Sequence, residues 1–360
     1  MQFEFTEEQT MIRQMVSDFA RDHASSQQVR QAMASESGFD PDSWQVLSQN
    51  LGIAGLLVPD DLGGQGLGLI EMALVFEQLG QYLLPSPLLQ TGVIGPTLLL
   101  NLQDKALQQH WLPQLASGQL TVSVARLVDG IADYVIGGHS ADVLILCSDD
   151  INNELYIIDT ADRKCQGTIR VTRQDMMDQT RAAGRIEVLN QKGMDEYRVA
   201  DGTSAKNALQ RAEQFGHIAV AAEAVGSAQS CLDKTVQYVK DRRQFGRAIG
   251  SFQAVKHQLA DMMVHIEAAR SAVYFSACSV AEQPLQLPEM ASLARVQASE
   301  ALSLCAAEMI QLHGGIGFTW EHDAHLYFKR ARSTATLLAT NSVLDEVIAE
   351  QLGLCNVGVS

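Results

Sequence analysis

The chain has 360 residues, a composition that is 46% hydrophobic and 19% charged, and a formal net charge of −16 at pH 7. This length predicts a globular protein of two or three domains. The negative charge argues against nucleic acid and anionic membrane as the main partner, because both bind accumulated lysine and arginine. No apolar run approaches the roughly 20 residues that cross a bilayer, which argues against membrane insertion. The amino terminus lacks a secretion signal, so we expect a cytoplasmic protein.

The sequence pattern predicts helices in the first third of the chain. Thr6 and Gln9 form a plausible capping box. The apolar residues of an amphipathic helix follow at three- and four-residue spacing: Phe5, Met11, Ile12, Met15, Val16 and Phe19. More helices follow, interrupted by a glycine-rich loop from Gly52 to Gly68 that lacks the ending of a phosphate-binding loop. We predict a helical domain over residues 1–119.

The periodicity changes from helical to alternating after residue 119. Short strand candidates are separated by Gly, Asp and Asn: LTVSVARLV, ADVLILCS, ELYIID, GTIRVTR and GRIEVLN. We predict a small β domain over residues 120–203. The six cysteines of the chain form no C-x-x-C pair, so we expect reduced, mostly buried thiols and no metal site: Cys147, Cys165, Cys231, Cys278, Cys305 and Cys355.

Helical periodicity returns over residues 204–360, where the sequence DRRQFGRAIGSFQAVKH from Asp241 to His257 stands out. Its arginines suit phosphate oxygens, and its glycines suit a tight link between two helices. The helix after the link has one apolar face: Phe252, Val255, Leu259, Met262, Met263 and Ile266. We predict an anion-binding site at the link. The alternative is a surface hairpin with solvated arginines.

Two motifs resemble the acyl-CoA dehydrogenase family. One is R-x-x-F-G-x-x-I-x-x-F-Q-x-x-x-H from Arg242 to His257, and the other is QLHGGIGF from Gln311 to Phe318. The loop after Gly52 and the segment from Glu77 to Gly80 are also similar to that family. The resemblance implies an α+β, mainly α fold: a helical domain (1–119), a middle β-barrel or sheet domain (120–203) and a carboxy-terminal four-helix bundle (204–360).

The resemblance also implies an oxidoreductase with FAD as cofactor and an acyl-CoA as substrate. In the family the flavin accepts a hydride from the β-carbon while a glutamate removes the α-proton, which gives a 2-enoyl-CoA. Such enzymes form dimers or dimers of dimers, and they pass electrons to an acceptor flavoprotein. Positions that match the family's FAD contacts are Arg242, Gln244, Phe252, Gln253, Gln311, Leu312, His313, Gly314 and Gly315.

The catalytic base of the family has no counterpart in this chain. In most members it lies on a loop that matches Leu337–Thr340, so its expected position is Leu338. In a minority it lies on the first carboxy-terminal helix, at a position that matches Gly216, beside His217. Glu213 and Glu223 are the nearest carboxylates, about one and two turns away, and both fit ordinary helix glutamates better than a base.

The middle of the chain departs from the family as well, because the T-E-P-x-x-G-S-D and W-I-T-N strings that cover the flavin ring are missing. These losses favour one hypothesis. The chain is a degenerate subunit of a heteromeric acyl-CoA dehydrogenase that gives its FAD contacts to a homologous partner, which supplies the glutamate. The alternatives are a non-redox structural or acyl-CoA-binding subunit, and an active homo-oligomer with a displaced base. Lys329, Arg330 and Arg332 match a basic string of the family, or form a solvated helix end.

Overall fold

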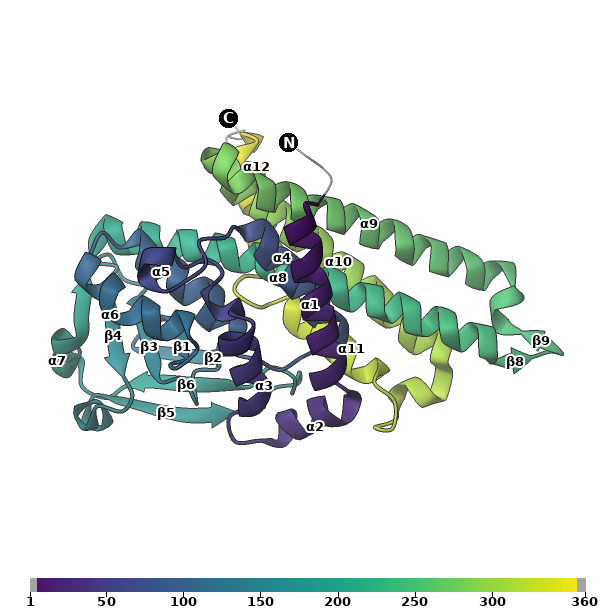
Figure 1. Ribbon diagram of the computed structural model, residues 1–360, viewed down its shortest axis with the longest axis horizontal. Helices are drawn as coiled ribbons and strands as arrows, with labels where there is room; N and C mark the ends of the chain where they lie inside the picture. Colours follow the sequence, from purple (N-terminus) through teal and green to yellow (C-terminus); the bar gives the residue numbers. More distant parts are fainter. Residues whose placement is uncertain (1–4, 355–360) are drawn as a thin grey trace, which may run out of the picture. The chain divides into compact units, whose positions relative to one another are not determined.

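The computed structural model describes residues 5–354 and is mainly helical with small sheets (Figure 1), as the sequence predicts. Over this range the strands form open sheets and no closed barrel. The chain divides into two compact units. We call them the helical unit, with the described residues of 1–26, 69–84 and 217–360, and the mixed unit, with residues 27–68 and 85–216. The three-domain division at residues 119 and 203 stays a prediction.

The helical unit is a bundle of long helices. It contains α1 (Glu7–His23), α4 (Leu69–Tyr82), the part of α8 (Gly202–Asp241) from residue 217, α9 (Gln253–Glu282), α10 (Leu287–His313), α11 (Ala324–Thr334) and α12 (Asn341–Gln351). The capping box of Thr6 and Gln9 is confirmed, and Val16 and Phe19 are buried. Met11 is 71% exposed, so its prediction as part of the apolar face was wrong.

Helices α4 and α8 cross at very close range. A Cβ on Gly226 would overlap the backbone carbonyl of Glu77, and a Cβ on Gly80 would overlap that of Glu223. The hydroxyl of Ser227 also donates to the carbonyl of Gly80 over 2.8 Å. Glycine is therefore required at both positions, because any side chain would push the two helices apart.

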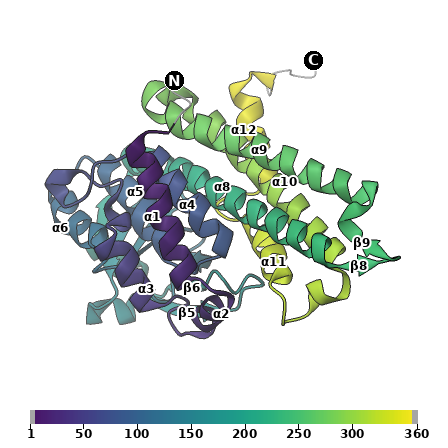
Figure 2. The ribbon, with the colours of Figure 1, turned by 45° about the vertical axis from the view of Figure 1, so that its right-hand side comes forward.

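The predicted link between two helices is a short hairpin that joins α8 to α9 (Figure 2). It consists of β8 (Arg243–Gln244) and β9 (Arg247–Ala248), and it turns through Phe245 and Gly246, both at positive φ. On α9, Met262 and Ile266 are buried as predicted. Met263 is 57% exposed, which corrects its prediction as a core residue.

The mixed unit carries the shorter helices and the two larger sheets. Its helices are α2 (Ser26–Ala34), α3 (Pro41–Gln45), α5 (Gly95–Asn101), α6 (Lys105–Ala116), α7 (Gln191–Met194) and the first part of α8. Two side chains between α4 and α5 fix the start of the first strand: Thr91 Oγ1 accepts from Val122 N over 3.1 Å, and Gln90 Oε1 accepts from Val124 N over 3.0 Å.

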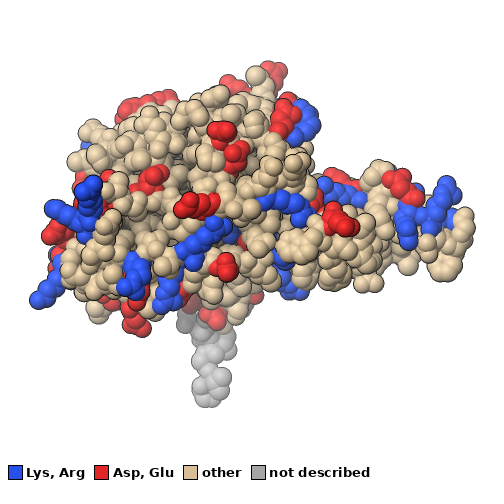
Figure 3. All heavy atoms as spheres, turned by 90° about the horizontal axis from the view of Figure 1, so that it is seen from below, with Lys and Arg blue, Asp and Glu red and all other residues tan. Residues whose placement is uncertain are grey.

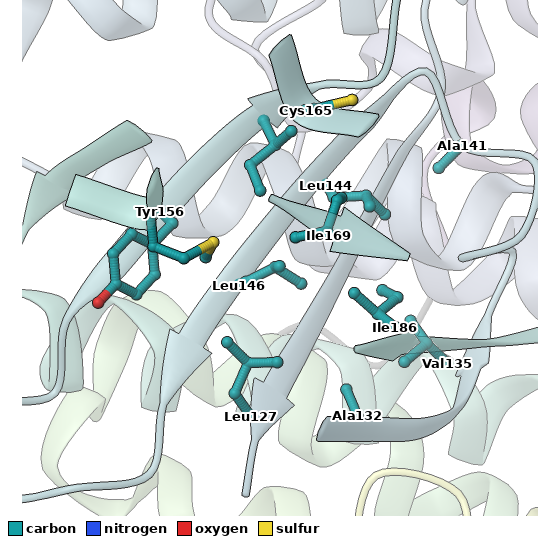
Figure 4. Close-up of a cluster of buried hydrophobic side chains, with 12 residues drawn as sticks. Leu127, Ala132, Val135, Ala141, Leu144, Leu146, Tyr156, Cys165, Ile169 and Ile186 are labelled. Carbon is teal, nitrogen blue, oxygen red and sulfur yellow. The ribbon is translucent and has the colours of Figure 1, made fainter. Parts of the chain in front are cut away.

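The strands form a four-stranded sheet in the order β1-β3-β4-β7 and a three-stranded antiparallel sheet in the order β2-β6-β5. Their bounds are β1 (Val122–Leu127), β2 (Ile131–Ile136), β3 (Val143–Ser148), β4 (Leu155–Asp159), β5 (Ile169–Gln174), β6 (Ala183–Val188) and β7 (Arg198–Ala200). Buried side chains such as Leu144, Leu146 and Ile186 form the core of this region (Figure 4).

The described cysteines are free thiols, and Cys147, Cys165, Cys231 and Cys305 are buried, as predicted; Cys355 lies outside the described residues. No helix within residues 5–354 is both long and apolar enough to span a membrane.

Candidate functional site

The sequence-predicted cofactor contacts fall into two groups at one end of the helical unit. The first group, Arg242 to Gln253, runs from the end of α8 through the hairpin to the start of α9, and the second, Gln311 to Gly315, ends α10. Tyr238 on α8 joins them, because its ring stacks on His313 with 4.2 Å between ring centroids and its hydroxyl donates to the His313 carbonyl over 3.4 Å. The structure therefore brings together residues that are about seventy positions apart in the sequence.

Arg242 has the properties that a phosphate contact requires. It is exposed, and within residues 5–354 its side chain has no hydrogen-bond or ion-pair partner. Arg243 and Arg247 are exposed beside it, and basic side chains gather at the end of the molecule that carries the hairpin (Figure 3). Arg247 lies over the ring of Phe252, 3.9 Å from its centroid. A free guanidinium in this setting is suited to bind an anionic oxygen.

The backbone of the two glycines after α10 is accessible to a bound molecule. Gly314 has a φ of +63°, a conformation that favours glycine. Gly315 has no positive φ, and a Cβ there would meet nothing within 4 Å. The fold of this chain alone therefore does not require glycine at position 315. An exposed glycine of this kind lets a bound molecule approach the backbone closely, so this segment fits a cofactor contact.

His313 is the one buried member of the predicted set. Its Nδ1 lies 2.8 Å from the Met309 carbonyl and therefore donates a proton to it. Burial lowers the pKa of His313. Its ring also packs on His322, 4.6 Å away, which accepts from Ala324 N through Nδ1 over 3.1 Å. No group of three or more possible metal ligands occurs in the part of the chain that the structure describes.

The two positions where the family places its base hold no carboxylate. Gly216 is buried within α8. Leu338 lies between α11 and α12 with a φ of +65°, a strained conformation for leucine. The backbone before Leu338 is fixed by Arg295 of α10, a fully buried side chain that donates to the carbonyls of Thr334 and, over 3.3 Å, Leu337.

Glu213, the nearer of the two candidate carboxylates, forms an ion pair with an arginine of the mixed unit. Both of its oxygens accept from Arg126 at the end of β1, each over 2.7 Å. This bidentate geometry is the strongest that an arginine makes with a carboxylate, and it raises the pKa of Arg126. A carboxylate held in this way is unavailable for proton abstraction.

Glu223 is engaged as well, in the helical unit. Arg330 of α11 is only 1% exposed, and its Nη1 donates to Glu223 Oε1 over 2.5 Å. The interpretation of Arg330 as part of a solvated helix end was therefore wrong. A signal for its burial exists in the sequence, because Leu326, Tyr327 and Thr334 share its helical face.

His217, beside Gly216, is a residue whose environment the sequence does not reveal. It is 8% exposed, and its Nδ1 is enclosed with no hydrogen-bond partner among the described residues. Burial, and then the positive charge of Arg295, lower its pKa to about 3. The imidazole is therefore neutral at physiological pH.

This chain is similar to several known proteins. The model of the acyl-CoA dehydrogenase N-terminal domain matches residues 6–119, and that of the C-terminal domain matches residues 207–353. Two relatives are the acyl-CoA dehydrogenases IpdE2 of Mycobacterium tuberculosis and Mycolicibacterium smegmatis. They are 41% and 38% identical over 92% of this chain, and the alignments cover 93% and 95% of the relatives. Among solved structures, a chain of the ChsE4-ChsE5 complex from Mycobacterium tuberculosis is 25% identical with a TM-score of 0.85, over 98% of this chain and 99% of that chain.

Proposed function

Because this chain belongs to the acyl-CoA dehydrogenase family of FAD-dependent oxidoreductases, we propose that it acts as one subunit of a heteromeric acyl-CoA dehydrogenase. In this proposal the chain contributes FAD contacts across a subunit interface. A homologous partner supplies the glutamate that removes the α-proton of an acyl-CoA, and a separate flavoprotein accepts the electrons.

The main support for the proposal is that this chain offers no free carboxylate near the expected base positions. Positions 216 and 338 offer no acid, and the two nearest glutamates are each held by an arginine, Glu213 by Arg126 and Glu223 by Arg330. A general base must be free to accept a proton within hydrogen-bond reach of the substrate. Neither glutamate meets this requirement, which argues against an active homo-oligomer with a displaced base.

The residues that match the family's FAD contacts support a role in cofactor binding in addition to a structural one. The side chain of Arg242 is exposed without a partner among the described residues, and the chain's own packing requires no glycine at Gly315. A purely structural subunit has no evident need for these features. FAD would supply hydride acceptance when bound, and Arg242 would neutralise part of its pyrophosphate charge. The named ChsE4-ChsE5 complex shows that a relative with this fold assembles with a second chain.

The first test is the visible absorption spectrum of the purified chain, alone and co-expressed with the product of its neighbouring gene. We expect flavin colour only from the co-expressed complex. A flavin spectrum from the single chain that an acyl-CoA bleaches would instead make it a self-sufficient enzyme, and no flavin in either preparation would favour a structural role.

The second test removes the proposed phosphate contact. Arg242→Ala should strip FAD from the complex, while Arg21→Ala, which removes an exposed arginine of α1, should leave the flavin content unchanged. Equal flavin content in both variants would contradict the assignment of Arg242.

A further inference from the structure

His322 lies in the segment that joins α10 to α11, shortly after the glycines that match FAD contacts. Its Nδ1 atom accepts a hydrogen bond from the backbone N–H of Ala324, the first residue of α11, over 3.1 Å. A backbone N–H can only donate, so Nδ1 has no proton in this arrangement and the ring is neutral. A protonated imidazole has a proton on both nitrogens, and it could not accept this bond.

The ring of His322 also contacts His313, which belongs to the predicted FAD contacts. His313 packs against two other rings: Tyr238 of α8 stacks on it with 4.2 Å between centroids, and His322 lies 4.6 Å away. The Tyr238 hydroxyl donates to the His313 carbonyl over 3.4 Å. Gly314 and Gly315 follow His313 directly, so the contacts that fix His313 also fix the start of the glycine segment.

The surroundings of His322 disfavour a positive charge on its ring. Burial lowers the pKa of His322 from 6.5 more than any other effect, whereas Asp323 raises it and Lys234 of α8 lowers it further. Asp323 also accepts a hydrogen bond from Ser26 Oγ over 2.6 Å. The charge of His322 acts in turn on His313, whose pKa it lowers. His322 therefore gains its proton at a pH below 6.5, and the hydrogen bond at Nδ1 is then lost.

We propose that His322 is a positioning residue for the FAD contacts of this chain: its neutral ring fixes His313 and the glycines that follow, and protonation of the ring weakens FAD binding. This inference rests on the proposed function, because it takes His313, Gly314 and Gly315 to contact FAD. His322 is not among the positions that match the family's FAD contacts, and it acts through His313. The complex should therefore lose flavin more readily in acid.

The test measures the dissociation constant of FAD from the co-expressed complex between pH 5 and pH 8. Ultrafiltration separates free FAD, and its visible absorption gives the concentration. Relative to a variant without the titrating ring, the wild-type constant should rise by up to about tenfold per pH unit below the pKa of His322. It should not rise above pH 6.5, where the ring is neutral.

Three variants assign the pH dependence to the ring nitrogen. His322→Ala removes both the ring and the acceptor, so FAD should bind about tenfold more weakly at pH 8. His322→Asn restores an acceptor for the Ala324 N–H, because an asparagine side chain accepts from the residue two positions on, but it has no proton to gain. This variant should bind FAD more tightly than the alanine variant and without the acid-dependent loss. His110→Asn, which replaces an exposed histidine of α6, is the matched control and should keep the wild-type pH profile.

Parallel pH profiles of the wild type and His322→Asn would overturn the inference, even if the alanine variant fails to fold. An alanine variant that binds FAD at pH 8 as tightly as the wild type would overturn it as well. Either result leaves the proposed function intact, since the complex still binds FAD. A complex that binds no FAD at any pH would instead refute the proposed function, and the inference with it.

Discussion

The Glu223–Arg330 pair shows how a buried charge decides the role of a residue. Arg330 is 1% exposed and needs an anion beside it. We expect Glu223→Leu to lower the free energy of unfolding by about 3 kcal/mol, because it leaves an arginine buried without its carboxylate. Thermal and denaturant unfolding of the purified complex measure this loss.

The double variant Glu223→Leu/Arg330→Met is the control for this prediction. It removes both charges, so it should recover most of the lost stability. If the single variant is as stable as the wild type, Glu223 does not neutralise Arg330.

His217 predicts a pH dependence with a defined sign. Its pKa is about 3 in the folded protein, below its ordinary value of 6.5. The unfolded chain therefore binds more protons between these values, so the neutral ring contributes stability above pH 6.5 that is lost as the pH falls towards 3. Relative to His217→Asn, which has no titrating ring, the wild type should lose roughly 1 kcal/mol per pH unit between pH 6 and pH 4.

Unfolding curves of the two proteins at several pH values provide this comparison. The other titrating groups are common to both proteins and cancel in the difference. Parallel pH profiles would mean that His217 is accessible to protons in the folded state.

Single residues also mark the limit of what the sequence can reveal about the site. The FAD-contact motif predicted positions that the structure brings to one end of the bundle, though their role stays a prediction. The partners Arg126 and Arg330 could not be predicted, because they meet Glu213 and Glu223 across 87 and 107 residues of sequence. Motif spacing contains no information about such contacts.

At the level of elements, periodicity predicted most of the fold. All five strand candidates contain observed strands, and the glycine-marked link is the hairpin between α8 and α9. Strand β2 was missed because a register shift between Ala132 and Val135 interrupts its alternation, and Tyr134 in the shift has positive φ. Strand β7 was missed because it has only three residues. Local irregularity thus hides short strands from pattern analysis.

The α4–α8 crossing predicts that a glycine substitution there destabilises the fold. Gly→Ala in a helix ordinarily stabilises by about 1 kcal/mol. Gly226→Ala should instead destabilise by about 1–3 kcal/mol, because the new methyl group overlaps the Glu77 carbonyl and forces α4 to move. The midpoint of thermal unfolding measures the change.

Gly315→Ala is the counterpart, since its added methyl group meets open space. Its unfolding midpoint should match the wild type, while the flavin content of the complex should fall. Loss of stability at position 315, or a stable Gly226→Ala, would show that the two glycines have other roles.

At the scale of the whole molecule, the hairpin end of the bundle has the character of an assembly surface. Phe245 is 91% exposed, and Phe318 and Trp320 are 75% and 60% exposed. Large exposed aromatic side chains beside arginines are typical of protein interfaces. Three exposed aromatic side chains and three exposed arginines thus lie at the end of the bundle where the proposed function requires a partner.

Phe245→Ser tests this surface. The ring contributes little to the fold of its own chain, so the unfolding midpoint of the isolated chain should not change. Association with the co-expressed partner, measured by sedimentation velocity, should weaken at least tenfold. Met11→Ser, which removes an exposed apolar side chain from α1, serves as the control, and equal association of both variants would exclude the hairpin from the interface.

The bonds from Arg295 have a consequence for how such a chain can evolve. Arg295 holds the segment before Leu338 through backbone carbonyls, which every amino acid possesses. The path of the loop is thus set independently of the side chain at position 338. Mutation can remove or restore an acid at that position while the loop keeps its shape. Selection for a catalytic side chain at position 338 and selection for a stable loop can therefore act independently.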